Sequence, residues 1–584
     1  MSRVFKSFTK REWGLLVITV GFVIVQVILD LKIPEFMSEV TTLVQTEGST
    51  MAEILMVGGY MLLCSILSLF ITILTGFCAA KAATKACMKM REDVYVKTNS
   101  FSMADITNFS IASLITRTTN DITQIQTVLC MGFVILIRAP FMCIFAINKI
   151  STNNPSFSLI AIVAVIMFLC VIGILLAMSV PKSRKLQKII DGLNTVVREH
   201  LTGVRVVRAY NAEGYHEEKF EKTNQEVAST NTFVNATMAF LNPFMSSLMS
   251  GITLAVYWIG AALISESGSP EAALTIFSDM VVFSSYATMI ILSFMVLTTI
   301  FMMLPRTLVA LSRIDEVINF ENKIKDGSKT SGDPTFPVAI EFKNVSFSYA
   351  ESEENVLENI SFRIHRGETA AFIGATGSGK STITKLILRN YEVTEGEILI
   401  DGINVKEYTQ HALREKLGFV SQTAVLFNGD ITSNIAFGIE KNISNENLNK
   451  AVEIAQAKDF VDQIGFDGSV SQGGLNLSGG QKQRVSIARA LYKDAEIYIF
   501  DDCFSALDYR TDRMLREKLR TQTKGSTKLI VAQRISTVKD ADVIVVIDQG
   551  RVAGIGTHKN LLSENALYRE IAESQLSKEE LNYA

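Results

Sequence analysis

One glycine-rich segment of the chain has a spacing suited to binding phosphate. GATGSGKS (374–381) matches the pattern G-x-x-x-x-G-K-[ST], follows the apolar run TAAFI and precedes the helical run TITKLILRN. In a strand-loop-helix setting, backbone N–H groups and the helix N-terminus attract phosphate oxygens. Lys380 is expected to reach the β and γ phosphates of ATP, and Ser381 to bind Mg²⁺. A glycine-rich turn without a ligand would fit the bare pattern too, but the flanking strand and helix favour the phosphate site.

Residues around a second apolar run indicate how well the predicted site would hydrolyse ATP. IYIFDDCFSALD (497–508) places Asp501 at the end of a strand, where it is expected to contact Mg²⁺ directly or through water. Asp502 follows directly. IVAQRIST (530–537) places Gln533 where a titratable side chain would be expected, and an amide cannot be protonated. These residues predict a site that binds ATP better than it cleaves it.

Length and composition indicate more than one domain and a membrane-embedded part. The chain has 584 residues, 48% of them hydrophobic, with a mean hydropathy of +0.27. A net charge of -3 with balanced acids and bases gives no indication of nucleic acid as a partner. A membrane span needs roughly 20 apolar residues. Six such runs are predicted, at 14–36, 55–80, 130–148, 156–179, 240–264 and 275–304.

The distribution of basic residues predicts the orientation in the membrane. Basic residues follow the second span from Lys81 to Arg91 and the fourth span from Lys182 to Lys188, whereas 36–53 has none. The positive-inside rule then places both termini in the cytoplasm. The first apolar run is too long for a signal-peptide core, so an uncleaved anchor is expected.

The remaining segments define the expected fold. The stretches between spans two and three and between spans four and five have helical patterns and are long enough to extend far into the cytoplasm. The polar segment 321–337 combines charge, Gly, Ser and Pro, which indicates a linker. The predicted fold is an all-α transmembrane domain of six helices at 1–320, with long cytoplasmic helical extensions, followed by an α/β P-loop NTPase domain at 338–584.

A further motif narrows the class of protein. LSGGQ (477–481), together with the phosphate loop, is typical of ATP-binding cassette transporters. The chain resembles an exporter-type half-transporter of this family, with six membrane helices ahead of one nucleotide-binding domain. The resemblance extends to TRTTNDI (116–122), EHLTGVRVVRAYNAE (199–213) and RTLVALSRIDEV (306–317), so it covers essentially the whole chain.

The resemblance implies roles for matching positions. Tyr349 is similar to the aromatic residue that stacks on adenine, although an ordinary strand aromatic is the alternative. Gln422 in GFVSQ resembles the residue that senses Mg²⁺ and water, and SALD (505–508) the loop between subunits. In this family two nucleotide domains enclose two ATP molecules, each held by the phosphate loop of one subunit and the LSGGQ of the other. The implied ATP contacts are Tyr349, Gly374, Ala375, Thr376, Gly377, Ser378, Gly379, Lys380, Ser381, Thr382, Gln422, Leu477, Ser478, Gly479, Gly480 and Gln481, and the implied Mg²⁺ contacts are Ser381, Gln422 and Asp501.

Departures from the family pattern point to an asymmetric assembly. The family usually has glutamate where this chain has Asp502, and histidine where it has Gln533. Gln472 and Gly473 stand where exporters often have a Glu-Arg pair. The resemblance is therefore to the degenerate subunit of a heterodimeric bacterial multidrug exporter in the inner membrane, whose partner is a second, different half-transporter. An importer on the same fold and an ATP-gated regulator or channel are the alternatives.

The residues that would contact a transported compound are less distinctive. Asp30, Lys32 and Arg138 lie in or near predicted spans, where ionisable residues are costly. Asp30 and Lys32 either belong to a polar pocket or lie at the outer interface. The sixth span carries Phe283, Tyr286, Phe294, Phe301 and Met302 at near-helical spacing, and packing is favoured over a drug site. An apolar, aromatic cavity would suit amphipathic drugs or lipids.

Overall fold

The computed structural model describes residues 9–46, 48–153, 155–267, 269–333, 335–349, 354–439 and 443–577. Internal contacts divide the chain into two compact units. The membrane unit comprises Met1–Asn99 and Ala112–Phe320, and the nucleotide unit comprises Ser100–Ile111 and Glu321–Ala584. The short helix α4 (Met103–Phe109) thus groups with the nucleotide unit. The domain boundaries at residues 320 and 337 stay a prediction.

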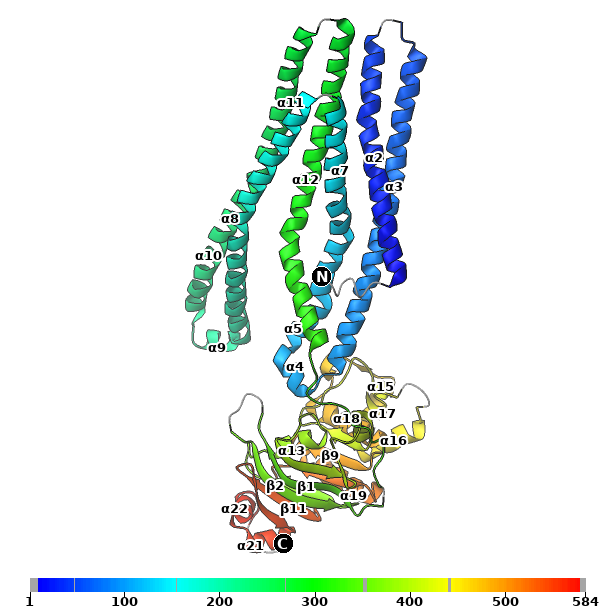
Figure 1. Ribbon diagram of the computed structural model, residues 1–584. Helices are drawn as coiled ribbons and strands as arrows, with labels where there is room; N and C mark the ends of the chain where they lie inside the picture. Colours follow the sequence, from blue (N-terminus) through cyan, green and yellow to red (C-terminus); the bar gives the residue numbers. More distant parts are fainter. Residues whose placement is uncertain are drawn as a thin grey trace. The chain divides into compact units, whose positions relative to one another are not determined.

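Long helices make up the membrane unit (Figure 1). Within the described residues, six helical stretches are long and apolar enough to cross a membrane: Lys10–Gln45, Met51–Asn99, Ile111–Ile150, Phe157–Thr202, Glu213–Glu266 and Pro270–Asn319. Five of the predicted spans lie within these stretches, and the fourth, predicted at 156–179, begins one residue before the stretch Phe157–Thr202. The helices are α2 (Lys10–Gln45), α3 (Met51–Asn99), α5 (Ile111–Thr116), α6 (Ile122–Thr127), α7 (Phe133–Asn153), α8 (Pro155–Thr202), α9 (Val204–Ala209), α10 (Glu213–Ala239), α11 (Leu241–Glu266) and α12 (Pro270–Asn319), with π-helical turns η1 (Arg117–Asp121) and η2 (Val128–Gly132).

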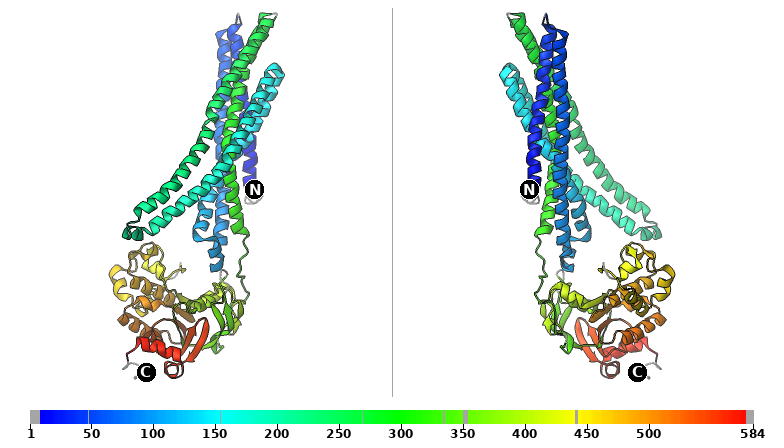
Figure 2. Two further views of the ribbon diagram at one scale, coloured as in Figure 1. Left: turned by 90° about the vertical axis from the view of Figure 1, so that its left-hand side faces the viewer. Right: turned by 90° about the vertical axis from the view of Figure 1, so that its right-hand side faces the viewer.

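Several of these helices are longer than a bilayer requires. At about 1.5 Å per residue, the 49 residues of α3 extend over roughly two and a half times the apolar thickness of a membrane. Figures 1 and 2 show α8 and α10 side by side, joined at one end by α9. An ion pair of 2.7 Å between Lys219 on α10 and Glu199 on α8 joins them. The polar sequence of α10 contains no buried residue, as expected for a helix outside the apolar layer. These are the predicted helical extensions.

The aromatic residues of the sixth span mostly pack inside the membrane unit. Phe283 and Tyr286 on α12 are 2% exposed, and the Phe283 ring lies 5.4 Å from the ring of Phe157 on α8. Phe294 lies 5.7 Å from the Phe168 ring. Phe301 is exposed. The side chain of Met302 lies outside the described set. Packing within the membrane unit is therefore the main role of these aromatic residues.

Asp30, Lys32 and Arg138, the charged residues singled out in or near the spans, each form an ion pair. Asp30 on α2 accepts a hydrogen bond from Ser68 on α3 (2.6 Å) and forms an ion pair with Arg138 on α7 (2.9 Å). Lys32 pairs with Glu35, one turn further along the same helix, at 2.7 Å. Pairing neutralises charges that would be costly in an apolar environment. Asp30 and Arg138 consequently tie α2, α3 and α7 together.

The nucleotide unit contains a six-stranded sheet in the order β12-β11-β3-β10-β9-β6. Its strands are β3 (Thr369–Ile373), β6 (Leu417–Val420), β9 (Ile497–Asp501), β10 (Thr527–Val531), β11 (Val543–Asp548) and β12 (Arg551–Gly556), and all neighbours are parallel except β11 and β12. Alternate residues of β3 enter two different cores: Ala371 and Ile373 on one face, Ala370 and Phe372 on the other. This is the expected buried sheet of an α/β domain.

Smaller sheets and a series of helices complete the nucleotide unit. A four-stranded sheet has the order β2-β1-β4-β5, and β7 pairs with β8. Their bounds are β1 (Val338–Phe347), β2 (Leu357–His365), β4 (Glu395–Ile400), β5 (Ile403–Asn404), β7 (Gly429–Asp430) and β8 (Ser469–Val470). The helices are α13 (Lys380–Ile387), α14 (Gln410–Glu415), α15 (Ile431–Ile435), α16 (Asn445–Ile454), α17 (Lys458–Ile464), η3 (Gln472–Gly474), α18 (Gly479–Tyr492), η4 (Cys503–Ala506), α19 (Tyr509–Gln522), α20 (Ile535–Val538), α21 (His558–Glu564) and α22 (Ala566–Gln575).

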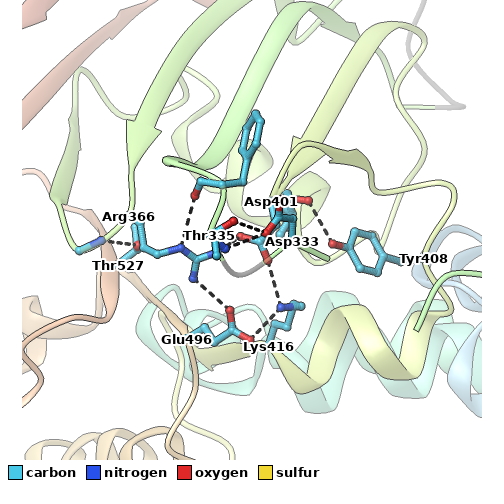
Figure 3. A network of polar contacts seen from close by, with 11 residues as sticks. Asp333, Thr335, Arg366, Asp401, Tyr408, Lys416, Glu496 and Thr527 are labelled. Atoms are coloured by element: carbon cyan, nitrogen blue, oxygen red, sulfur yellow. Dashed lines mark hydrogen bonds and ion pairs between the residues drawn. The ribbon is translucent and has the colours of Figure 1, made fainter. Parts of the chain in front are cut away.

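A charged network joins the two larger sheets (Figure 3). Asp401, whose side chain is buried, pairs with Arg366 at 2.5 Å and with Lys416 at 3.0 Å. Glu496 accepts from the same two cations, at 3.2 and 2.7 Å. A buried carboxylate is tolerated when paired and hydrogen-bonded in this way. Because Lys416 precedes β6 and Glu496 precedes β9, the network fixes the amino ends of these strands.

Candidate nucleotide-binding site

The phosphate loop connects the carboxyl end of β3 to the first turn of α13. A Cβ added to Gly374 would lie 2.0 Å from the carbonyl oxygen of Ile547, so only glycine fits there. Gly377 has a φ of +85°, and no neighbouring atom lies within 4 Å of the position of a Cβ. The loop thus combines close packing against β11 with open space beside its turn, as a cradle for phosphate requires.

Lys380 is buried beneath this loop. Its ammonium Nζ donates to the carbonyl oxygens of Gly374 (2.9 Å) and Ala375 (2.6 Å) and to Ser378 Oγ (3.2 Å). Burial lowers the pKa of Lys380, while the charges of Asp502 and Asp501 oppose this shift. The ammonium is therefore surrounded by oxygen acceptors, and the oxygens of a phosphate have the same chemistry.

Ser381 and Asp501 meet beside the loop. Ser381 Oγ donates to Asp501 Oδ1 at 2.8 Å. Thr384, one turn further along α13, donates to Asp501 Oδ2 at 3.2 Å. The hydroxyl and carboxylate oxygens gathered here are the donors that Mg²⁺ prefers. Thr384 was not predicted, although its spacing from Ser381 places it on the same face of the helix.

Two predicted glutamines converge on one carboxylate oxygen of a third predicted residue, Asp502. Asp502 Oδ2 accepts hydrogen bonds from Gln533 Nε2 (3.0 Å) and Gln422 Nε2 (3.3 Å). Burial and the nearby Asp501 charge raise the pKa of Asp502, while Lys380 and the Gln422 hydrogen bond act against the rise. The convergence follows from the strand order, because β10, β9 and β6 are parallel neighbours and their carboxyl ends meet at one edge.

Tyr349 belongs to a small aromatic cluster near α13. Its hydroxyl lies 3.2 Å from Thr382 Oγ1, and its ring centre is 5.2 Å from that of Tyr391, edge to face. Lys385 Nζ lies 5.8 Å from the centre of the Tyr349 ring. An aromatic ring tethered to the first turn of this helix can offer a stacking surface to a purine. Tyr391 and Lys385 were not predicted.

The LSGGQ segment forms the start of α18. Ser478 caps the helix: its hydroxyl accepts from Gln481 N (3.3 Å), and its own N–H donates to Gln481 Oε1 (2.8 Å). Leu477 packs against the apolar core. In the described part of the chain, no hydrogen bond or ion pair joins 477–481 to the phosphate loop at 374–382.

A residue far along the chain supports the loop that carries Gln533. Gln575, the last residue of α22, donates from Nε2 to the carbonyl oxygen of Gln533 (2.9 Å) and accepts at Oε1 from Ile535 N (2.8 Å). Its side-chain amide therefore pairs with the backbone on both sides of Arg534. No local sequence signal identifies Gln575, because its partners are about 40 residues away.

A phosphate-loop nucleotide domain joined to six membrane-length helices defines a nucleotide-dependent membrane transport protein. Two family models match the chain: "ABC transporter transmembrane region" over residues 16–294 and "ABC transporter" over residues 357–505. The chain belongs to the ABC transporter family and has the exporter-type half-transporter organisation that its motifs predicted. As in other members, its nucleotide domain binds ATP.

Relatives and a solved structure agree with this assignment. An uncharacterized ABC transporter ATP-binding protein of Mycobacterium tuberculosis is 32% identical over 559 residues, 94% of each chain. An ATP-dependent lipid A-core flippase of Haemophilus influenzae is 31% identical over 507 residues, 86% of this chain and 85% of the flippase. The structure of a bacterial Atm1-family ABC exporter with ATP bound has a TM-score of 0.80 at 25% identity, covering 97% of this chain and 99% of the exporter.

Proposed function

We propose that this chain is the half of a heterodimeric exporter that carries the weaker ATP site. A second, different half-transporter supplies the working hydrolytic residues, and the pair moves amphipathic drugs or lipids out of a bacterial cell. The observation that carries the proposal is that Oδ2 of Asp502 accepts two amide hydrogen bonds, from Gln422 and from Gln533.

The chemistry of Asp502 supports slow hydrolysis at this site. A general base for water must lie within hydrogen-bond reach of the proton that it removes. Asp502 is one methylene shorter than the glutamate of the family pattern, and a displacement of about 1 Å can cost roughly 100-fold in rate. Its Oδ2 is already shared by two amides. Gln533 can donate a hydrogen bond, but it cannot supply the positive charge of a protonated histidine to the developing phosphate charge.

The residues that would bind ATP and Mg²⁺ are retained in this chain. Lys380 and the loop glycines suit the phosphates, and Tyr349 offers its ring to adenine. Ser381 and Asp501 supply oxygen ligands for Mg²⁺, with Gln422 nearby on the next strand end. When bound, Mg²⁺ would neutralise phosphate charge. Retained binding groups beside an impaired base favour a site that holds ATP for longer than it cleaves it.

The signature segment is proposed to act on the partner's ATP. The capped N-terminus of α18 presents backbone N–H groups in a helix start without acidic residues, a setting that attracts phosphate. In the described residues it makes no hydrogen bond to this chain's own phosphate loop. Leu477 to Gln481 would therefore complete the competent site of the heterodimer.

The membrane unit is proposed to lie in the bacterial inner membrane with both termini in the cytoplasm. The basic residues after the second and fourth spans support this orientation. The H. influenzae relative is a lipid A-core flippase, which supports a lipid-like or amphipathic substrate here. We assign transport to 1–320, the linker to 321–337 and ATP binding to 338–584.

Restoring the two family residues tests the proposal. The purified full-length chain should hydrolyse ATP slowly, because a homodimer would contain two impaired sites. Asp502→Glu combined with Gln533→His should raise its ATPase rate by about 10²-fold or more, the range of general-base catalysis. Adding Lys380→Ala to this double variant should remove the gain, which would locate the new activity at this phosphate loop.

A second control addresses the signature segment. Ser478→Arg in the double-variant background should also abolish the gain, because it places bulk and charge where the other subunit's phosphates bind. If the unmodified chain alone hydrolyses ATP as fast as the double variant, its site is not impaired and the proposed asymmetry is wrong.

A further inference from the structure

The nucleotide unit contains a polar cavity away from the phosphate loop. Its volume is about 510 Å³, and it is lined by α19, α20 and parts of the neighbouring strands. Thr369 at the start of β3 and Lys528 near the start of β10 form part of the wall. The phosphate loop follows the other end of β3. The cavity thus reaches the amino ends of the strands whose carboxyl ends hold the nucleotide site.

Cations outnumber acids in the lining of this cavity. The acidic side chains are Glu517 and Asp540, and the cations are Arg513, Arg516, Arg520, Lys528 and Lys539. Arg513, Arg516 and Arg520 lie on one face of α19, because residues three to four positions apart share a helix face. A concave wall carrying mostly one sign of charge concentrates its field and raises the local concentration of oppositely charged ions.

Two of the cations are already bound to the protein. Arg516 pairs with Asp512 at 3.0 Å and donates from Nη1 to the carbonyl oxygen of Ser536 at 2.8 Å. Lys528 is buried and donates to the carbonyl oxygens of Thr523 (3.0 Å) and Ser526 (3.2 Å). These contacts fix the floor of the cavity and its wall along α20.

The other three cations differ from these two in having no hydrogen-bond or ion-pair partner among the described residues. In the described ranges, Arg513, Arg520 and Lys539 make no side-chain hydrogen bond or ion pair, and all three are exposed. Two come from α19 and the third from the residue after α20. Cations from separate elements thus line one cavity, and in the described ranges neither Glu517 nor Asp540 of the lining forms an ion pair with Arg513, Arg520 or Lys539.

We propose that this cavity binds a small polyanion with at least two anionic groups, of which a diphosphate is the simplest. Guanidinium groups bind phosphate through paired, charge-assisted hydrogen bonds, and Arg513 and Arg520 can supply such pairs from neighbouring turns of α19. Lys539, directly after α20, adds a further positive charge to the lining. The cavity volume suits a small anion rather than a folded partner. This site is independent of the proposed heterodimer.

Binding of inorganic pyrophosphate to the full-length chain tests the proposal. Lys380→Ala should be present throughout, so that the phosphate loop contributes little to the signal. Isothermal titration calorimetry should detect saturable binding, and hydrogen exchange of α19 and α20 should slow on addition of pyrophosphate. Adding Arg520→Gln and Lys539→Gln should weaken binding by about tenfold or more, because charge-assisted contacts are lost.

Arg510→Gln is the matched control, since it removes the same charge from α19 at a position outside the cavity lining. It should leave pyrophosphate affinity unchanged. If the double cavity variant unfolds, Arg513→Gln alone should still lower the affinity severalfold. The proposal is overturned by absence of saturable binding in the Lys380→Ala chain, or by equal losses in the Arg510 and cavity variants.

Discussion

Gln575 offers a direct test of how the loop after β10 is held in place. Gln575→Ala removes the side-chain amide that donates to the Gln533 carbonyl oxygen (2.9 Å) and accepts from Ile535 N (2.8 Å). The loop would then keep its connection to Asp502 through the Gln533 side chain. We expect local loosening of 533–535 without unfolding of the sheet, because Gln575 is exposed at the end of α22.

The magnitude follows from the two contacts that are lost. A hydrogen bond contributes about 0.5–1.5 kcal/mol net, and an exposed pair belongs at the lower end of that range. Together the two bonds stabilise the loop by about 1 kcal/mol, which corresponds to a roughly fivefold change in a local opening equilibrium. The amide of Ile535 should therefore exchange with solvent about fivefold faster in the variant.

Hydrogen exchange of peptides that cover 533–538 measures this effect. Gln575→Glu keeps an acceptor for Ile535 N and loses the donor to Gln533, so it should show a smaller increase. Ser574→Ala is the control, because its hydroxyl bonds within α22 to Ile571. Unchanged exchange in Gln575→Ala would refute the reasoning. A uniform increase over the whole nucleotide unit would show that Gln575 acts on global stability instead.

Three further predictions concern the nucleotide site and the membrane unit. Lys380→Ala should lower ATP affinity in a binding titration by about tenfold or more, because an ammonium facing phosphates contributes roughly 1.5–3 kcal/mol; unchanged affinity would remove Lys380 from the site. Single cysteines at Gln45 and Lys329 should differ in intact cells, with only the first reacting with an impermeant thiol reagent; labelling at Lys329 would contradict the topology. Arg138→Met should lower the free energy of unfolding, measured by thermal denaturation, by about 1–2 kcal/mol, a range that allows for the partial exposure of the arginine. Adding Asp30→Asn should recover part of this loss, because the aspartate would no longer be left without its cation. If the losses of the two single variants simply add in the double variant, the pair is not coupled.

Much of the fold was determined by local sequence patterns. In the described residues, the six apolar runs of membrane length lie in six long helical stretches, because hydrophobicity over about 20 residues decides whether a segment spans a bilayer. The phosphate loop also formed between β3 and α13 as its pattern predicted. The spacing of the glycines and the start of the following helix depend on only a few neighbouring residues, so a short motif is enough to predict the phosphate loop.

Tertiary structure alone decided which side chains meet. Asp502 receives both Gln422 and Gln533 because β6, β9 and β10 are neighbours in the sheet. Arg138 finds Asp30 through the packing of α7 against α2, and Gln575 reaches the loop after β10 through the packing of α22. These contacts join residues separated by 31 to 108 positions. Strand order and helix packing depend on the burial of whole faces, which no short pattern of residues specifies.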